Sequence, residues 1–175
     1  MSNKNPILNI ADVELRGMPA GVPAHLESKF GGAKIGRIGP MVGAQKLGCS
    51  LTAVPPGRRA FPFHSHRANE EMFFILEGSG EVRIGGERYS IRSGDVIACP
   101  PGGAETAHQI INTGTVELRY LAISTKLSPE IAEYPDSQKF GVLAEFPGEG
   151  GAPQFFRYLG RAAGSLDYYD GEPTE

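Results

Sequence analysis

The sequence predicts an all-β fold, a sandwich or barrel in a single domain, from three observations. The chain has 175 residues, which is enough for one domain with a hydrophobic core. Its 24 glycines and 14 prolines are spread as turns between short apolar runs and are not gathered in a low-complexity block. No long helical periodicity and no internal repeat is present. Short strands separated by frequent turns are typical of sandwiches and barrels.

Residues 1–45 are expected to form an N-terminal arm with extra strands. The apolar stretch Ile7 to Val13 predicts an edge strand or an arm. His25 to Phe30 predicts a helical turn, because two glycines follow it and glycine tends to end helices. Lys34 to Gly39 predicts a strand.

The strongest strand patterns lie in residues 46–125, which we expect to form the core barrel. Gly85-Gly86 predicts a two-residue hairpin turn, because it tolerates positive φ. The expected strands of this region are Leu47 to Val54, Met72 to Leu76, the hairpin Glu81 to Ile91, Val96 to Cys99, His108 to Asn112 and Val116 to Ser124.

Residues 126–175 are expected to form a C-terminal extension that packs on the barrel or on a partner subunit. Ser128-Pro129-Glu130 predicts a helix start, with serine as N-cap and proline at the first helical position. Tyr134 to Ser137 predicts a turn, residues 147–153 a flexible loop, and Gln154 to Leu159 one more strand.

Charge and composition exclude several classes of protein. The net charge is −3, with Lys and Arg scattered, so we expect no nucleic-acid partner. No apolar run approaches the roughly 18 residues of a membrane span. The first twenty residues lack a secretory signal pattern, and Cys49 and Cys99 are too few for a disulfide framework, so we expect a cytoplasmic protein with reduced cysteines.

A histidine pair carries the strongest chemical signal. His64 and His66 share one face of a predicted strand, because side chains alternate along a strand. If Arg67 to Glu70 forms a four-residue hairpin loop, Glu71 pairs across from His66 on that face. Two imidazoles and a carboxylate so placed suit a divalent metal. The alternative is a pair of hydrogen-bonded structural histidines and a solvated carboxylate.

A third histidine, His108, begins another predicted strand. Three imidazoles and one carboxylate can bind a first-row divalent ion and still leave coordination positions for water or substrate.

Two motifs around these residues resemble those of the cupin superfamily. Gly57, His64, His66, Glu71 and Gly78 fill the first motif, with six residues instead of five after the first glycine. Gly94, Pro100, Gly102, His108 and Asn112 fill the second, with five residues (103–107) between Gly102 and the histidine where the family has two. The resemblance covers residues 50–125. It implies a jelly-roll β-barrel, with short helical turns in the flanks, around a metal held by His64, His66, Glu71 and His108.

Within the superfamily, the segments PPGGAETAHQIIN and YPDS look like a group of small bacterial cupins often described as sugar-phosphate isomerases. This implies a metal-dependent enzyme acting on a small oxygen-rich metabolite, a sugar phosphate or an oxo acid. A metal-dependent dioxygenase or decarboxylase and a non-catalytic small-ligand-binding protein are the alternatives.

The ligand set favours one divalent ion per chain, Mn²⁺ first and Fe²⁺, Ni²⁺ or Zn²⁺ as alternatives. Glu105 is the candidate catalytic base by its proximity to His108, and an exposed loop carboxylate is its alternative interpretation. Arg59 and Tyr120 are the candidate substrate contacts, Arg59 for a phosphate or carboxylate, although Tyr120 also fits the barrel lining. We expect a homodimer, because jelly rolls leave sheet edges to be covered.

Overall fold

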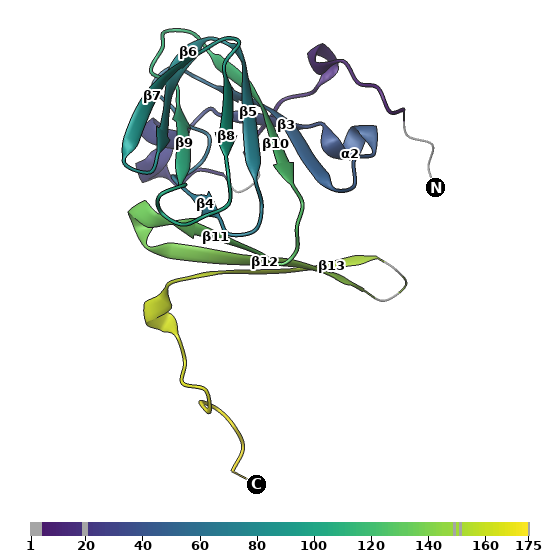
Figure 1. Cartoon of the computed structure of the whole chain (residues 1–175), viewed down its shortest axis with the longest axis vertical. Coiled ribbons are helices and arrows are strands. Elements are labelled where there is room, and N and C mark those ends of the chain that lie inside the picture. The colour runs from purple at the N-terminus through teal and green to yellow at the C-terminus, as the bar shows by residue number, and fades with distance from the viewer. Residues whose placement is uncertain (1–4, 19–20, 149, 151, 175) are drawn as a thin grey trace.

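The structure is a computed structural model and describes residues 5–18, 21–148, 150 and 152–174. Its strands form three antiparallel sheets, arranged as a jelly-roll-like sandwich (Figure 1). In spatial order, the first sheet contains β1 (Arg16–Gly17), β2 (Lys34–Arg37), β3 (Leu47–Val54), β10 (Leu118–Thr125), β5 (Glu71–Glu77) and β8 (Val96–Cys99). The second contains β7 (Glu87–Arg92), β6 (Ser79–Ile84) and β9 (His108–Ile111). The third contains β13 (Pro153–Gly160), β12 (Lys139–Pro147), β11 (Glu130–Tyr134) and β4 (Ser65–His66).

The second and third sheets are joined through two histidines. His64 and His108 form an isolated antiparallel bridge, with N–H to O distances of 3.2 Å and 2.7 Å. The two smaller sheets therefore form a continuous wall opposite the six-stranded sheet. Figure 1 shows β11, β12 and β13 crossing one end of the barrel.

The main hydrophobic core fills the space between the two walls. Leu118 and Ile75 of the six-stranded sheet are fully buried, and Val82 and Ile110 of the second sheet complete the same cluster. This core fixes both walls, and hence the histidines that lie between them.

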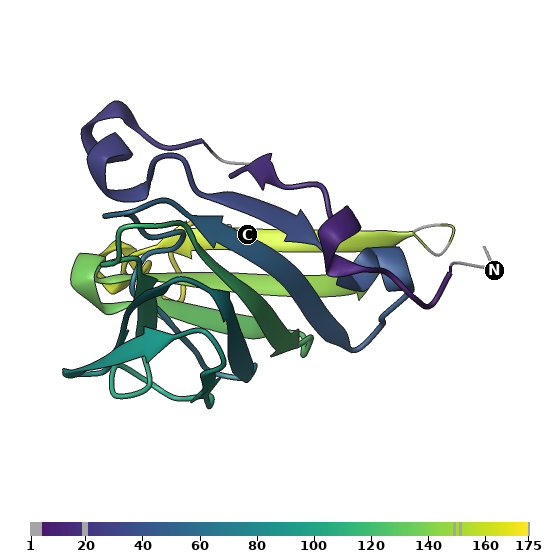
Figure 2. The same cartoon turned by 90° about the horizontal axis from the view of Figure 1, so that it is seen from above.

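A second, smaller core lies on the outer face of the six-stranded sheet. Val13, Ile38 and Leu51 pack together there, so the described part of the N-terminal region lies on its own barrel. Figure 2 shows this segment alongside β2 and β3. The helical elements are short: η1 (Ile10–Asp12), η2 (Ala24–Leu26), α1 (Glu27–Phe30), α2 (Gly39–Val42), η3 (Pro135–Ser137) and η5 (Ala162–Gly164). Among the described residues, none of the helices combines the length and the hydropathy that crossing a bilayer requires.

The structure confirms the predicted strands of the barrel to within two residues at most ends, including the hairpin around Gly85, whose φ is 54°. It also confirms the helical turn over 24–30 and the strand at 153–160. Ile7 to Val13 forms no strand; it contains η1 instead. Residues 1–4, 19–20, 149, 151 and 175, which include parts of the arm and of the predicted loop, lie outside the described residues.

The predicted helix start at Ser128-Pro129-Glu130 is wrong. Residues 130–134 form β11, paired on one side with β12 and on the other with β4. The N-cap pattern is a weak local preference, whereas the strand gains two ladders of backbone hydrogen bonds and buries the Glu130 side chain. Tertiary pairing therefore determines the conformation of this segment.

Candidate metal centre

Three imidazoles converge on one carboxylate between the walls of the sandwich. The Nε2 atoms of His64, His66 and His108 lie 3.8, 3.5 and 2.9 Å from Oε2 of Glu71. Ligand atoms of His64, His66 and Glu71 all lie within 4.8 Å of one another. His108 is only 3% exposed, and the other three side chains are mostly buried. The four residues that the sequence predicted as metal ligands thus lie together.

The route by which they meet differs from the prediction. Glu71 does not pair across from His66; it pairs with Cys99 and Ser124 in the six-stranded sheet, while His66 pairs with Ala132 of β11. The segment after His66 is held by β11 and so cannot form the expected two-stranded hairpin. The carboxylate and the imidazoles therefore face each other across the sandwich instead of lying side by side on one sheet.

Backbone carbonyls orient two of the rings. Nδ1 of His64 lies 2.8 Å from the carbonyl oxygen of Pro62, and Nδ1 of His108 lies 3.3 Å from that of Thr106. A carbonyl can only accept, so Nδ1 of His64 donates its proton and the lone pair of its Nε2 is left toward the centre, whereas Nε2 of His108 makes its shorter contact with Oε2 of Glu71 at 2.9 Å. The His64 tautomer is the one that a metal-binding histidine uses when Nε2 is the ligand.

The third ring is oriented by a buried carboxylate. Oε2 of Glu130 lies 3.5 Å from Nδ1 of His66. Glu130 is only 6% exposed, and its carboxylate accepts hydrogen bonds from the backbone N–H groups of Arg67, Ala68 and Asn69 at 2.9–3.1 Å. Glu130 thereby holds both His66 and the loop that leads to Glu71.

The electrostatics follow from this burial. Burial and the nearby His108 lower the pKa of His64 to about 4, so its imidazole is neutral near pH 7. Burial would lower the pKa of His66 too, but hydrogen bonds to Glu71 and the charges of Glu71 and Glu130 raise it overall. Burial opposes the charge of Glu71, yet hydrogen bonds from His108 and His66 hold its pKa well below the usual value. Neutral imidazole and ionised carboxylate are the forms that bind metal.

The residues fit a divalent ion. Both ring nitrogens of His66 are buried, and their contacts with Glu71 and Glu130 are 3.5 Å long, longer than the hydrogen bonds that buried polar atoms normally make. An ion among the three Nε2 atoms and the Glu71 oxygen would satisfy Nε2 of His66, while Nδ1 of that ring faces Glu130. The donor set of three imidazoles and one carboxylate, without a thiolate, suits first-row divalent metals.

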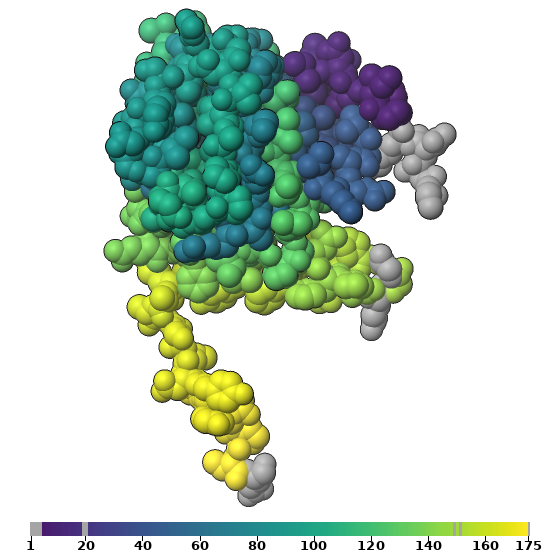
Figure 3. Space-filling model, viewed as in Figure 1, coloured from purple at the N-terminus to yellow at the C-terminus, as the bar shows by residue number. Residues whose placement is uncertain are grey.

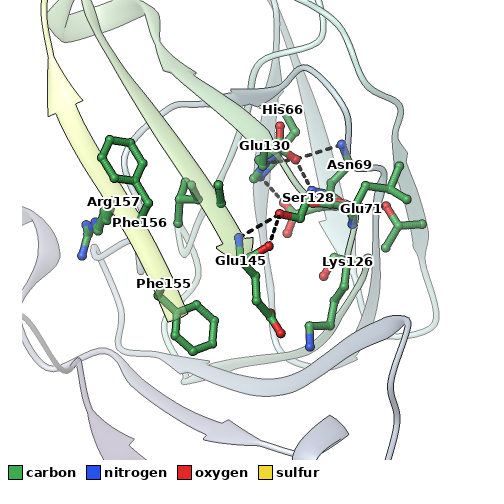
Figure 4. A pocket seen from close by; sticks show the side chains of 15 residues that line it. His66, Asn69, Glu71, Lys126, Ser128, Glu130, Glu145, Phe155, Phe156 and Arg157 are labelled. Atoms are coloured by element: carbon green, nitrogen blue, oxygen red, sulfur yellow. Dashed lines mark hydrogen bonds and ion pairs between the residues drawn. The ribbon is translucent and has the colours of Figure 1, made fainter. Parts of the chain in front are cut away.

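A cavity of about 460 Å³ leads to this cluster. His66 and Glu71 line it together with the end of β10 and the facing surfaces of β12 and β13 (Figure 4). A second cavity of about 240 Å³ shares Glu71, Ser124 and Lys126 with the first. Both volumes lie near or within the range of small-molecule sites.

The other three predicted site residues lie elsewhere. Tyr120 is 1% exposed in the main core, edge-on against Phe73, and lines neither cavity. Arg59 is half-buried near Arg88 and Asp136, and burial lowers its pKa.

Glu105 is exposed, and its carboxylate accepts a hydrogen bond from the N–H of Gly103, which lowers its pKa. Neither Arg59 nor Glu105 lines the two cavities that reach Glu71.

Two residues at the site were missed from the sequence. Glu130 was interpreted as part of a helix start, and Tyr134 as part of a turn. Tyr134 stacks on His64, with ring centroids 6.1 Å apart. Glu130 and Tyr134 are alternate residues of one short strand, so they project on the same face. The two-residue alternation of side chains along a strand was the available signal, but five residues are too few for this alternation to be recognised in the sequence.

Comparisons with known proteins show which proteins the chain is similar to. Residues 50–124 match the cupin domain family. The chain is 38% identical over 71 residues to an uncharacterized protein of Methanocaldococcus jannaschii, covering 41% of this chain and 54% of that protein. It is 34% identical over 70 residues to an oxalate-binding protein of Thermotoga maritima (40% and 54%), and 38% identical over 55 residues to 5-nitrosalicylic acid 1,2-dioxygenase of Bradyrhizobium sp (31% and 25%). The chain thus spans about half the length of the first two relatives.

Among solved structures, a sugar phosphate isomerase from a cupin superfamily, of Silicibacter pomeroyi, superimposes with a TM-score of 0.74 at 24% identity. The match covers 91% of this chain and 95% of that one, so the likeness in fold includes the β11–β13 region outside residues 50–124.

Proposed function

We propose that this protein, whose residues 50–124 match the cupin domain family, is a divalent-metal enzyme acting on a small oxygen-rich metabolite, with an oxo or hydroxy acid as a stronger candidate than a sugar phosphate. The observation that carries this proposal is the convergence of three Nε2 atoms on Glu71 Oε2 next to a cavity large enough for a small molecule. The names of two relatives support an acid, because one binds oxalate and the other acts on 5-nitrosalicylic acid.

We propose His64, His66, Glu71 and His108 as the ligands of one ion, with Mn²⁺ first. A bound ion would supply Lewis-acid polarisation of a substrate oxygen. The test is elemental analysis of protein purified without chelator, where we expect close to one divalent ion per chain, largely lost in His64→Ala and in His108→Ala. His25→Ala, at an exposed histidine outside the cluster, is the matched control. Full metal retention in both cluster variants would contradict the ligand set.

For the reaction, we propose isomerase-like proton transfer. Such a reaction needs a base within reach of the substrate. Besides Glu71 and Glu130, Glu145 is the remaining carboxylate among the described residues that line the larger cavity, so it replaces Glu105 as the candidate. We expect Glu145→Gln to lower turnover and Glu105→Gln to leave it unchanged. The reverse result would restore Glu105.

A dioxygenase or decarboxylase is the second candidate, supported by the name of the Bradyrhizobium relative. Assays of candidate acids with Mn²⁺ and Fe²⁺, with and without oxygen, separate the two. Oxygen uptake coupled to substrate loss would select the dioxygenase, and binding without any turnover would leave a ligand-binding protein.

We also propose a homodimer. β13 is the outer strand of its sheet, and its residues from 153 to 159 are all exposed, including Phe155 at 72% and Leu159 at 47%. An unpaired apolar edge favours pairing with another chain. Light scattering should give twice the mass of the chain, and a monomeric mass would contradict the proposal.

A further inference from the structure

The wall of the larger cavity that faces the metal cluster is apolar. Figure 4 shows Phe155 and Phe156, from β13, on the opposite side of the cavity from His66 and Glu71. Leu127, Leu143 and Ala144 complete this apolar lining. A ligand that reaches the histidines therefore contacts aromatic and aliphatic carbon along its length.

Most polar groups of the lining are already engaged within the protein. Asn69 bonds through Nδ2 to the carbonyl of Leu127 and to Glu130, and its Oδ1 accepts from Thr125 Oγ1 and from the N–H of Leu127. Ser128 Oγ accepts from the N–H of Glu145 at 2.8 Å. Apart from the charged groups of Lys126, Glu145 and Arg157, a polyhydroxylated ligand would find few free partners for its hydroxyl groups, and unpaired polar groups are costly to bury.

One cation lies at the shared end of the two cavities. Lys126 lines both, as does Glu71, and its ammonium makes no ion pair with any of the residues that the structure describes. Arg157 adds a second positive charge to the lining, on β13. The carboxylates of Glu71 and Glu130 are held by histidines and backbone amides. Glu145 adds one exposed carboxylate to the lining, so the charged groups left for a ligand are two cations, Lys126 and Arg157, and one anion.

From these observations we propose that the cavity selects an organic acid with a ring-sized apolar body, in preference to a sugar phosphate or a small acid without that body. The acid group lies at the end formed by His66, Glu71 and Lys126, and the body lies against Phe155, Phe156 and Leu143. The inference rests on the proposed function for the placement of the acid group, and it extends that function by naming the substrate class and the residues that determine it.

The test uses three probes on the full-length, Mn²⁺-loaded protein by calorimetry: phenyllactate, lactate and glucose 6-phosphate. Phenyllactate and lactate share the same hydroxy-acid group and differ by one phenyl ring. Partial burial of that ring predicts that phenyllactate binds about tenfold tighter than lactate or more. Equal affinity for the two acids, tighter binding of glucose 6-phosphate, or no binding of any probe would overturn the proposal.

Variants of the lining residues test whether the apolar wall causes the preference for phenyllactate over lactate. We expect Phe155→Ala to remove most of the phenyllactate preference while leaving lactate affinity unchanged. Tyr158→Ala is the matched control, because Tyr158 is an exposed aromatic of the same strand that does not line the cavity. Lys126→Gln should lower the binding affinities of phenyllactate and lactate by a similar factor. A preference that survives Phe155→Ala would overturn the role of this wall.

The same measurement on His108→Ala separates the two proposals. If that variant loses metal and still prefers phenyllactate over lactate, the apolar wall acts as proposed and binding of the acid does not require the metal. If the wild type binds metal but shows no preference, the metal proposal stands and this inference fails.

Discussion

The barrel and the β11–β13 sheet contribute to the same cavity in opposite ways. The barrel supplies His64, Glu71 and His108 from a tightly packed interior, in which Leu118 is fully buried. The sheet supplies one buried carboxylate, Glu130, and an exposed apolar wall. Figure 3 shows the C-terminal segment beyond this sheet extending away from the body of the molecule. The comparison implies that the proposed metal centre would be a property of the core, while the proposed ligand preference would be determined at the surface.

The largest difference between the two regions is expected in stability. Leu118→Ala in the barrel should cost about 2–5 kcal/mol, because it opens a cavity in a packed core. At protein concentrations too low for the proposed dimer to form, Phe155→Ala on β13 should change the free energy of unfolding by less than about 0.5 kcal/mol, because that side chain is 72% exposed in the single chain. Urea denaturation of both variants measures the difference. Similar losses at higher protein concentration would mean that β13 is covered in solution, as the proposed dimer predicts.

The second prediction concerns the pH dependence of the metal-free protein. The pKa of His64 is about 4 in the folded protein, compared with 6.5 as the ordinary value. Between these two pH values the unfolded chain therefore binds more protons than the folded chain, so the free energy of unfolding falls as pH falls from 6.5 to 4. The effect is at most about 3 kcal/mol. His66 acts in the opposite direction: its raised pKa contributes stability below pH 6.5 that is lost as pH rises through the folded value.

The measurement is urea denaturation of apo protein across pH 4–6.5. In His64→Gln the fall toward low pH should become smaller, with the part due to the lowered pKa of Glu71 remaining near pH 4, and in the β13 variant Phe155→Ala the whole fall should stay. An unchanged slope in His64→Gln would show that His64 is not a source of the pH dependence.

The same division explains what the sequence could and could not predict. The barrel strands and the four clustered residues follow from local patterns: alternation, turn glycines and two motifs with fixed spacing. The hairpin register of His66 and Glu71 was wrong, because a two-residue strand has no preference that can compete with β11, a partner more than sixty residues away. Glu130 was missed for the same reason. Its role depends on backbone amides of residues 67–69, which no pattern around residue 130 reveals.

The placement of Arg59, Tyr120 and Glu105 shows another limit. Glu105 was chosen for its proximity in sequence to His108, Arg59 for its guanidinium, and Tyr120 as a residue that alternates with the barrel lining. Tyr120 alternates inward as expected, but the inward face near Phe73 is packed core and not cavity. Glu105 is three residues from His108, yet its carboxylate turns back to its own loop. Proximity in sequence does not determine which side of a strand or loop faces an opening.

The third prediction tests whether Glu130 positions His66. Glu130→Gln should lower metal affinity about 10–100-fold, as removal of an outer-shell carboxylate typically does. Glu133→Gln is the control, since Glu133 lies on the same strand, is paired with Arg67 at 2.7 Å and does not contact the histidines. Competition with a chelating dye measures affinity, and circular dichroism monitors the fold. Equal affinities in the two variants would reduce Glu130 to a structural role.

The smallest effect is expected at a surface contact that joins the two regions. Arg83 of β6 pairs with Asp136 of η3 at 3.0 Å, and its guanidinium lies 3.6 Å from the ring centroid of Phe63. Asp136 is half-exposed, so Asp136→Asn should cost less than about 1 kcal/mol and the cost should shrink at high salt. Arg83→Ala should cost more, because it also removes the stacking on Phe63. Urea denaturation at low and high salt measures both. If Asp136→Asn cost as much as Arg83→Ala at low salt, the stacking of Arg83 on Phe63 would contribute nothing measurable.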